Sequence, residues 1–281
     1  MESELLIATN GFRGTWLSIE YGAWLAEIMR MKITLLGVTE NINPAAIDDH
    51  HPLEDVFERA VGLFREKGLA YTLEVRNGEA ETVIPEKANS ADCITVVSPL
   101  GRTQIRRMIS GRSIRPLMER IKGPILYVPE LRLPLKKILI GAGGLGSEEV
   151  AENLALQVAT ANLAEVTILH VIPPTDLDYP TTRGLQAHVK DLAATDTLPG
   201  RSLRRALEIA QHAGLSAKAI ARQGIVVEEI LSELKEGNYD MVCMGSSYST
   251  HTLRQYYAPH VTAEVAESAN RPVLTARYRR E

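Results

Sequence analysis

The sequence predicts an α/β protein built from two tandem doubly wound domains, each with a five-stranded parallel sheet. Three observations predict it. The chain has 281 residues, enough for two domains at the usual ~100–200 residues each. Short apolar runs alternate with longer helical patterns, and the order of these segments occurs twice. Apolar strands separated by helices require right-handed crossovers, which cover both faces of a parallel sheet with helices.

The internal repeat can be read directly from the two halves of the chain. Residues 5–11 are similar to residues 138–144, and residues 33–38 are similar to residues 166–171. Both pairs have the same offset of 133 residues. Two similar segments at one offset indicate a tandem duplication.

The offset between the copies grows along the chain, because Pro124 matches Pro272 at 148 residues. We assign most of the extra length to a loop of the second copy between Pro173 and Gly200, which is rich in Pro, Thr, Asp and Gly. A proline also separates the copies in Arg132-Leu133-Pro134. The expected domains are therefore residues 1–133 and 134–281.

Each copy is expected to contain five strands. In the first copy they lie near residues 4–9, 32–38, 71–76, 93–98 and 124–128. In the second copy they lie near residues 138–142, 166–172, 217–222, 240–245 and 272–277. Helices in the second copy are expected near residues 201–213, 226–236 and 260–269.

A further helix is expected to start at Ser147, a typical N-cap residue that is followed by two glutamates in the favourable first turn. Val150, Leu154 and Val158 recur at intervals of four residues. This spacing predicts that they form the buried stripe of that helix.

Composition and charge exclude several classes of protein. Lys and Arg total 31 against 35 Asp and Glu, a formal net charge of −4. No overall positive field exists to bind nucleic acid or an anionic membrane, so we expect neither partner. Residues 1–5 lack the basic region of a signal peptide, and no stretch approaches the ~18 apolar residues of a membrane span. We expect a cytoplasmic protein.

The two cysteines, Cys93 and Cys243, lie in separate apolar runs and show no CxxC or Cys/His ligand spacing. We expect both to be reduced, buried thiols.

The order of the segments resembles the universal stress protein family in its tandem two-domain form. The similarity covers nearly the whole chain and is strongest in residues 138–144, 166–171, 240–246 and 268–274. It implies Rossmann-like sheets, dimerisation through the last strand, and often an ATP site. The family's site has an Asp after the first strand, backbone at the end of the second, and Gly-x2-Gly-x9-Gly-Ser/Thr after the fourth.

The first copy keeps part of that glycine pattern. Gly101 and Gly111 match its second and third glycines, Ser98 stands at the first, Arg112 replaces the hydroxyl residue, and Ser113 follows one position later. Glycines allow the chain to pass close to phosphate oxygens, and the next helix directs free N–H groups at the anion.

The second copy keeps less of the pattern. Gly245 remains, but Tyr248 replaces the second glycine and Pro259-His260 aligns with the closing Gly-Ser. The Asp position is Asn10 in the first copy and Gly143 in the second. We therefore expect a degenerate nucleotide site, more so in the second copy.

Five arginines surround the two glycines of the first copy, at positions 102, 106, 107, 112 and 115. They are interpreted either as a solvated basic surface or as an anion site in which guanidinium groups supplement lost backbone contacts. For ATP or another anion in domain 1, the expected lining is Asn10, Gly101, Arg102, Gly111, Arg112 and Ser113.

Residues 141–146 spell the dinucleotide fingerprint G-x-G-x-x-G, but the second strand ends in residues 171–174 without the required acid. A tight glycine turn, or another small ligand at the helix N-terminus, is the alternative. Residues 48–51 with Glu54 and Asp55 are interpreted as a polar loop with helix-capping acids rather than a metal site.

Two more clusters are interpreted without a catalytic role. Ser246, Ser247, Ser249 and His251 show no G-x-S-x-G elbow. The aromatic side chains of Trp16, Tyr21 and Trp24 are expected in a core or an interface.

The leading hypothesis is a non-catalytic ligand-binding or interaction module in stress response, with no catalytic residue, no metal and no certain cofactor. The alternative is an ATP-binding protein with slow hydrolysis or autophosphorylation in domain 1. A small-molecule enzyme is a third hypothesis, which the fold alone does not exclude. The expected partners are a nucleotide or small anion and an unknown protein. The copies are expected to pair through their last strands as a pseudo-dimer within one chain, and a homodimer is left open.

Overall fold

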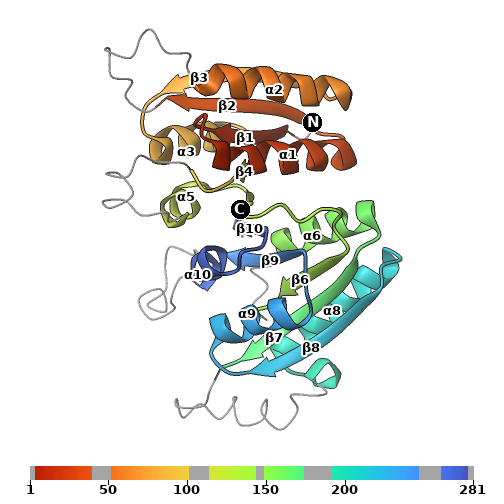
Figure 1. Ribbon diagram of the computed structural model, residues 1–281. Helices are drawn as coiled ribbons and strands as arrows, with labels where there is room; N and C mark the ends of the chain where they lie inside the picture. Colours follow the sequence, from red (N-terminus) through yellow and green to blue (C-terminus); the bar gives the residue numbers. More distant parts are fainter. Residues whose placement is uncertain are drawn as a thin grey trace. The chain divides into compact units, whose positions relative to one another are not determined.

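The computed structural model describes residues 4–39, 52–100, 114–143, 149–173, 192–246 and 261–277. It divides into two compact units, Met1–Leu131 and Arg132–Glu281, next to the proline at which we placed the boundary. Figure 1 shows the elements of both units coloured along the sequence.

The first unit has a parallel sheet in the order β3-β2-β1-β4-β5. Its strands are β1 (Glu4–Thr9), β2 (Lys32–Thr39), β3 (Tyr71–Asn77), β4 (Cys93–Val97) and β5 (Ile125–Tyr127). Its helices are η1 (Arg13–Thr15), α1 (Trp16–Met29), α2 (Pro52–Glu66), α3 (Ala80–Ser90) and α5 (Arg115–Arg120).

The second unit repeats this order as β10-β9-β6-β7-β8, again with parallel pairs. Its strands are β6 (Lys137–Gly141), β7 (Glu165–Ile172), β8 (Ala217–Gln223), β9 (Met241–Ser246) and β10 (Val273–Arg277). Its helices are α6 (Glu149–Asn162), η3 (Leu192–Ala194), α8 (Leu198–His212), α9 (Val226–Glu236) and α10 (Val261–Ser268). The predicted α/β class with tandem doubly wound sheets is confirmed.

The buried face of α6 differs from the predicted stripe, because Val150 is 42% exposed. Half of the buried residues of α6 are alanines, and the buried set comprises Ala151, Glu152, Ala155, Leu156, Val158 and Ala159. Small side chains let the helix backbone approach the sheet closely, so that the Sγ of Cys243 donates to the carbonyl of Ala151 at 3.0 Å. The prediction was wrong at Val150 because it assumed that the bulkiest side chains face inward.

Of the aromatic residues of α1, Tyr21 lies in the core as expected, and Trp16 and Trp24 are partly buried. Tyr21 is fully buried, and its ring meets that of Trp24 edge-on at 4.9 Å between centroids. The guanidinium of Arg59 on α2 lies 3.9 Å from the centre of the Trp16 ring. These contacts anchor α1 and α2 beside the sheet.

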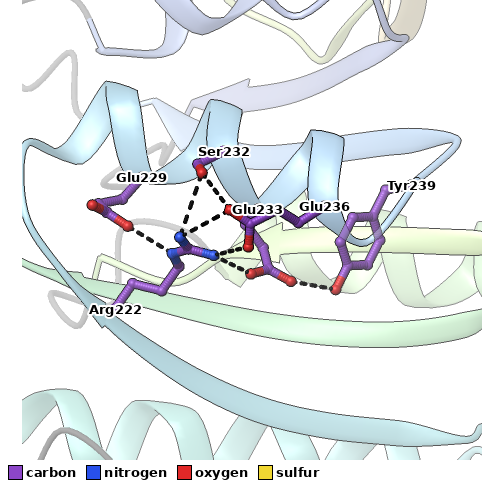
Figure 2. A network of polar contacts seen from close by, with 6 residues as sticks. All are labelled: Arg222, Glu229, Ser232, Glu233, Glu236 and Tyr239. Atoms are coloured by element: carbon purple, nitrogen blue, oxygen red, sulfur yellow. Dashed lines mark hydrogen bonds and ion pairs between the residues drawn. The ribbon is translucent and has the colours of Figure 1, made fainter.

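An arginine on the outer strand of the second unit bonds three glutamates of one helix. Figure 2 shows Arg222 of β8 bonded to Glu229, Glu233 and Glu236 of α9, at 2.6, 2.8 and 2.9 Å. The hydroxyl of Tyr239 also donates to Glu233 at 2.9 Å. The hydrogen bonds to the three glutamates raise the pKa of Arg222, and the bond to Glu236 has the largest effect. The guanidinium in turn lowers the pKa of Glu236. The cluster fastens α9 to the edge of its sheet.

We expect Arg222→Gln to lower the thermal unfolding midpoint at pH 7 by about 2–4 °C, because three carboxylates lose their shared cation. The pKa of Glu236 is held below its ordinary value of 4.5. The stabilisation is therefore present above about pH 4.5 and is lost as the pH falls through the lower folded-state pKa. Calorimetric scans from pH 7 to pH 3 should show the two proteins converging. Lys218→Gln on the same strand is the control, and an equal shift there would contradict the assignment.

Both cysteines are free and buried, in β4 of one unit and β9 of the other. Burial raises the pKa of Cys93 to about 11, and it raises the pKa of Cys243 as well. The thiolate, which is the reactive form, is therefore disfavoured at neutral pH.

We expect the native protein at pH 8 to react slowly with a thiol reagent. After denaturation without reductant, the same titration should find two thiols per chain. Finding none would contradict both the burial and the reduced state.

Candidate functional site

The strand order locates a candidate site in each unit. From β1 the chain proceeds to β2 and β3 on one side, while β4 and β5 lie on the other side. In doubly wound sheets the crevice for a ligand lies where the order reverses, at the carboxyl ends of the strands. This point falls between β1 and β4 in the first unit and between β6 and β9 in the second.

Four buried hydroxyl groups meet at the reversal point of the first unit. They belong to Thr9, Thr15, Ser18 and Ser98, each at most 1% exposed. The Ser98 hydroxyl, just after β4, donates to that of Ser18 on α1 at 3.3 Å. The hydroxyls of Thr9 and Thr15 are 2.6 Å apart. The Ser18 hydroxyl also donates to the backbone carbonyl of Thr15 at 2.7 Å, so the two hydroxyl pairs are linked through Thr15 into one chain from β1 through α1 to β4.

The directions of these bonds follow from counting protons. Thr15 donates its single hydroxyl proton to the carbonyl of Phe12 at 2.6 Å, so Thr9 must donate to Thr15. The Thr9 oxygen in turn accepts from the N–H of Gly11 at 3.2 Å. The hydroxyls at this point are therefore bonded to the protein itself.

The turn after β1 also lies close to the end of β4. A Cβ added to Gly14 would stand 3.2 Å from the carbonyl oxygen of Pro99. Gly11 has φ of 83°, in the left-handed region that favours glycine. This turn, which contains Asn10, therefore runs tightly across the reversal point.

One predicted ligand residue, Asn10, lies at this point. Gly101, Arg102, Gly111, Arg112 and Ser113 fall outside the described residues. The arginines at 106 and 107 also fall outside them, whereas Arg115 opens α5. The structure therefore shows one member of the predicted set and leaves the others as predictions.

Sequence reasoning missed the hydroxyls of Thr9, Thr15 and Ser18. A signal was available in the comparison of the two copies at the offset of 133 residues. At that offset Thr9 corresponds to Ala142 and Ser18 to Ala151. Polar groups present in only one copy point to a local arrangement that the shared fold does not require.

The second unit has a different polar arrangement at its reversal point. Glu149 and Glu152 lie in the first turn of α6, and Glu152 is 1% exposed. Arg205 of α8 bonds Glu149 and lies 3.5 Å from a carboxylate oxygen of Glu152. Anions are favoured at a helix N-terminus, so these carboxylates take the electrostatic place of an external phosphate. The first turn of α1, by contrast, carries no acidic residue.

A buried histidine contacts the chain just after β6 in the second unit. His170 of β7 is 7% exposed, and its Nδ1 lies 2.7 Å from the carbonyl oxygen of Ala142. A carbonyl only accepts hydrogen bonds, so Nδ1 donates. The matching residue of the first unit is Gly37, where an added Cβ would lie 2.8 Å from the ring of Phe57. His170 therefore fixes the exit of β6.

Most of the other sequence candidates lie in parts of the chain that the structure does not describe. Residues 48–51, 144–146, Ser247, Ser249 and His251 lie outside the described residues. Within the described ranges, no three His, Cys, Asp or Glu side chains are grouped to bind a metal. The helices in these ranges include none with the length and apolar character needed to cross a membrane.

Comparison with known proteins settles the family. The model of the universal stress protein family matches residues 134–277, which is just over half of the chain. The chain belongs to the universal stress protein family. Its first unit repeats the strand order of the matched unit, so the predicted tandem form is confirmed. A search among curated proteins finds no match.

Solved structures of this family share the fold. A universal stress protein from Archaeoglobus fulgidus is 16% identical with a TM-score of 0.68, over 98% of this chain and 96% of that one. A putative universal stress protein from Pseudomonas aeruginosa is 15% identical with a TM-score of 0.66, over 98% and 93%. A universal stress protein in complex with cAMP is 22% identical with a TM-score of 0.40, over 52% and 99%.

The hydroxyl chain predicts a measurable coupling in this universal stress protein. We expect Thr9→Val and Thr15→Val each to lower the free energy of unfolding by about 1–2 kcal/mol, because each leaves a buried partner with one bond fewer. A double-mutant cycle in urea should give a coupling of about 0.5–1.5 kcal/mol. Exposed Thr72→Val is the control, with an expected change within about 0.5 kcal/mol. Strict additivity of the two variants would show that the hydroxyls act separately.

Proposed function

We propose that this protein is a non-catalytic ligand-binding or interaction module in stress response whose nucleotide site is degenerate. The observation that carries the proposal is that the four buried hydroxyls at the reversal point of the first unit all have hydrogen-bond partners within the protein. Thr9 bonds Thr15 and Ser98 bonds Ser18. Thr15 and Ser18 also donate to backbone carbonyls. Groups that already have partners gain less from a ligand, because each new bond must replace an existing one.

The second unit supports the same conclusion by a different route. Glu149 and Glu152 already place negative charge at the N-terminus of α6. A phosphate there would meet like charges, partly compensated by Arg205. We propose that this unit binds no nucleotide.

A second candidate is an ATP-binding protein with slow hydrolysis or autophosphorylation in the first unit. The absence of acids from the first turn of α1 favours it, since an anion there meets no like charge. On this proposal the ligand, ATP or a smaller anion, contacts Asn10, Gly101, Arg102, Gly111, Arg112 and Ser113.

We propose that the protein acts in the cytoplasm on an unidentified protein partner, and that it binds neither nucleic acid nor membrane. We also keep the prediction that the last strands of the two copies, near residues 124–128 and 272–276, pair within one chain. An apolar edge strand left open would favour aggregation, which gives the physical reason for such pairing.

The two candidate functions differ in the ATP binding and ATP turnover expected of the unmodified chain and of the Asn10→Asp variant. A charge-assisted hydrogen bond contributes roughly 1.5–3 kcal/mol, or about tenfold to a hundredfold in affinity. If the site is degenerate for lack of this carboxylate, calorimetry on the full chain should show weak or no ATP binding, and the variant should bind about tenfold to a hundredfold more tightly. Neither protein should turn over ATP under the proposed function.

Two further variants locate the binding. Gly111→Trp should abolish the ATP binding of the Asn10→Asp protein, because bulk there would fill the proposed cradle. Gly143→Trp, at the matching end of β6, should leave it unchanged. Tight binding of ATP by the unmodified chain, or loss of binding in the Gly143→Trp variant, would contradict the proposed site.

A further inference from the structure

The edge strand β3 of the first unit exposes apolar side chains. Leu73 is 41% exposed and Val75 is 57% exposed. Among the described residues β3 pairs with β2 alone, so its other edge has no strand beside it there. An exposed apolar edge is a template for pairing with another chain.

The backbone bonds to β2 identify which groups of β3 face that open edge. The carbonyl of Ala70 accepts from Ile33, and the N–H of Gly78 donates to Thr39. In a parallel pair, alternate residues direct both backbone groups to the same neighbour. Even-numbered residues therefore face β2. The backbone N–H and C=O groups of the odd-numbered residues point outward, and these residues are Tyr71, Leu73, Val75 and Asn77.

Charge selects one register for pairing with an identical strand. Two antiparallel copies must place odd residues opposite odd residues. A twofold axis at Glu74 places the two Glu74 carboxylates of the copies opposite each other, and an axis at Arg76 does the same with the two guanidinium groups. Both registers are unfavourable because like charges meet. An axis at Leu73 places Glu74 opposite Thr72, which carries no charge. An axis at Val75 places Glu74 of each copy opposite Arg76 of the other, so that two pairs of opposite charge form.

We propose that β3 pairs antiparallel with β3 of a second copy of this chain, about a twofold axis at Val75. Val75 then faces Val75, and Leu73 faces Asn77, as hydrogen-bonded pairs. Glu74 and Arg76 form non-hydrogen-bonded pairs, in which opposite side chains lie closest. Within one chain these two side chains already lie 2.6 Å apart, so the dimer places two such ion pairs next to each other with opposite charges facing.

Lys87 of α3 also reaches Glu74, at 2.6 Å, and restrains its carboxylate beside Arg76. The corresponding strand of the second unit lacks this complementarity. By the same alternation, β8 presents three alanines and Gln223 at its open edge. Its charged side chains, Lys218 and Arg222, are both cationic, and Arg222 is already bonded to three glutamates. The proposal therefore concerns β3 and not β8.

Sedimentation of the full chain over a range of concentrations tests the proposal. We expect a reversible dimer. Arg76→Glu brings carboxylates opposite each other at both pairs and should weaken the dimer by about tenfold or more. The double variant Glu74→Arg/Arg76→Glu restores opposite charges and should restore the dimer. Lys218→Glu on β8 is the matched control and should leave it unchanged.

Hydrogen exchange on the unmodified chain gives an independent readout. The amides of Leu73, Val75 and Asn77 should become protected as the concentration rises through the dimer transition. A chain that stays monomeric, a dimer insensitive to Arg76→Glu, failure of the double variant to restore it, or unprotected amides in the dimer would overturn the proposal.

Discussion

Each unit depends on a first strand that is paired on both edges and buried on both faces. Leu5, Leu6 and Ile7 of β1 are at most 1% exposed, and the strand bonds β2 on one side and β4 on the other. Polar groups at the end of such a strand lose water, so they must find partners within the protein. Burial of the first strand therefore also determines which polar side chains must be paired at the reversal point.

The two units meet this constraint differently. In the first, Thr9, Thr15 and Ser18 satisfy one another and nearby carbonyls. In the second, alanine stands where two of these hydroxyls would be, and the ionic contacts of Arg205 with Glu149 and Glu152 supply the polarity instead. With the same backbone arrangement, the polar groups of the two units thus find partners within the protein in two different ways. In both units these groups gain less from binding an external ligand. This difference supports a degenerate site more directly than the loss of glycines from the motif.

The sequence predicted the fold well, but it did not predict the hydroxyls of Thr9, Thr15 and Ser18 at the reversal point. Strand β1 and helix α9 have the predicted bounds, because apolar runs and helical periodicity follow directly from burial. Val150 was misplaced because alanines, which carry little weight in such patterns, make up half of the buried residues of α6. The hydroxyl chain escaped prediction because it depends on distances between β1, α1 and β4. The exposure of Leu73 and Val75 could not be predicted either, because the sequence of an apolar strand is similar at the edge and in the centre of a sheet.

The most direct test of the degenerate site is to identify what the chain retains from its own cells. Native mass spectrometry after purification without denaturant measures the bound small molecules and their stoichiometry. The account predicts no adenine nucleotide at one or more per chain. Such a nucleotide, retained at full occupancy, would contradict it.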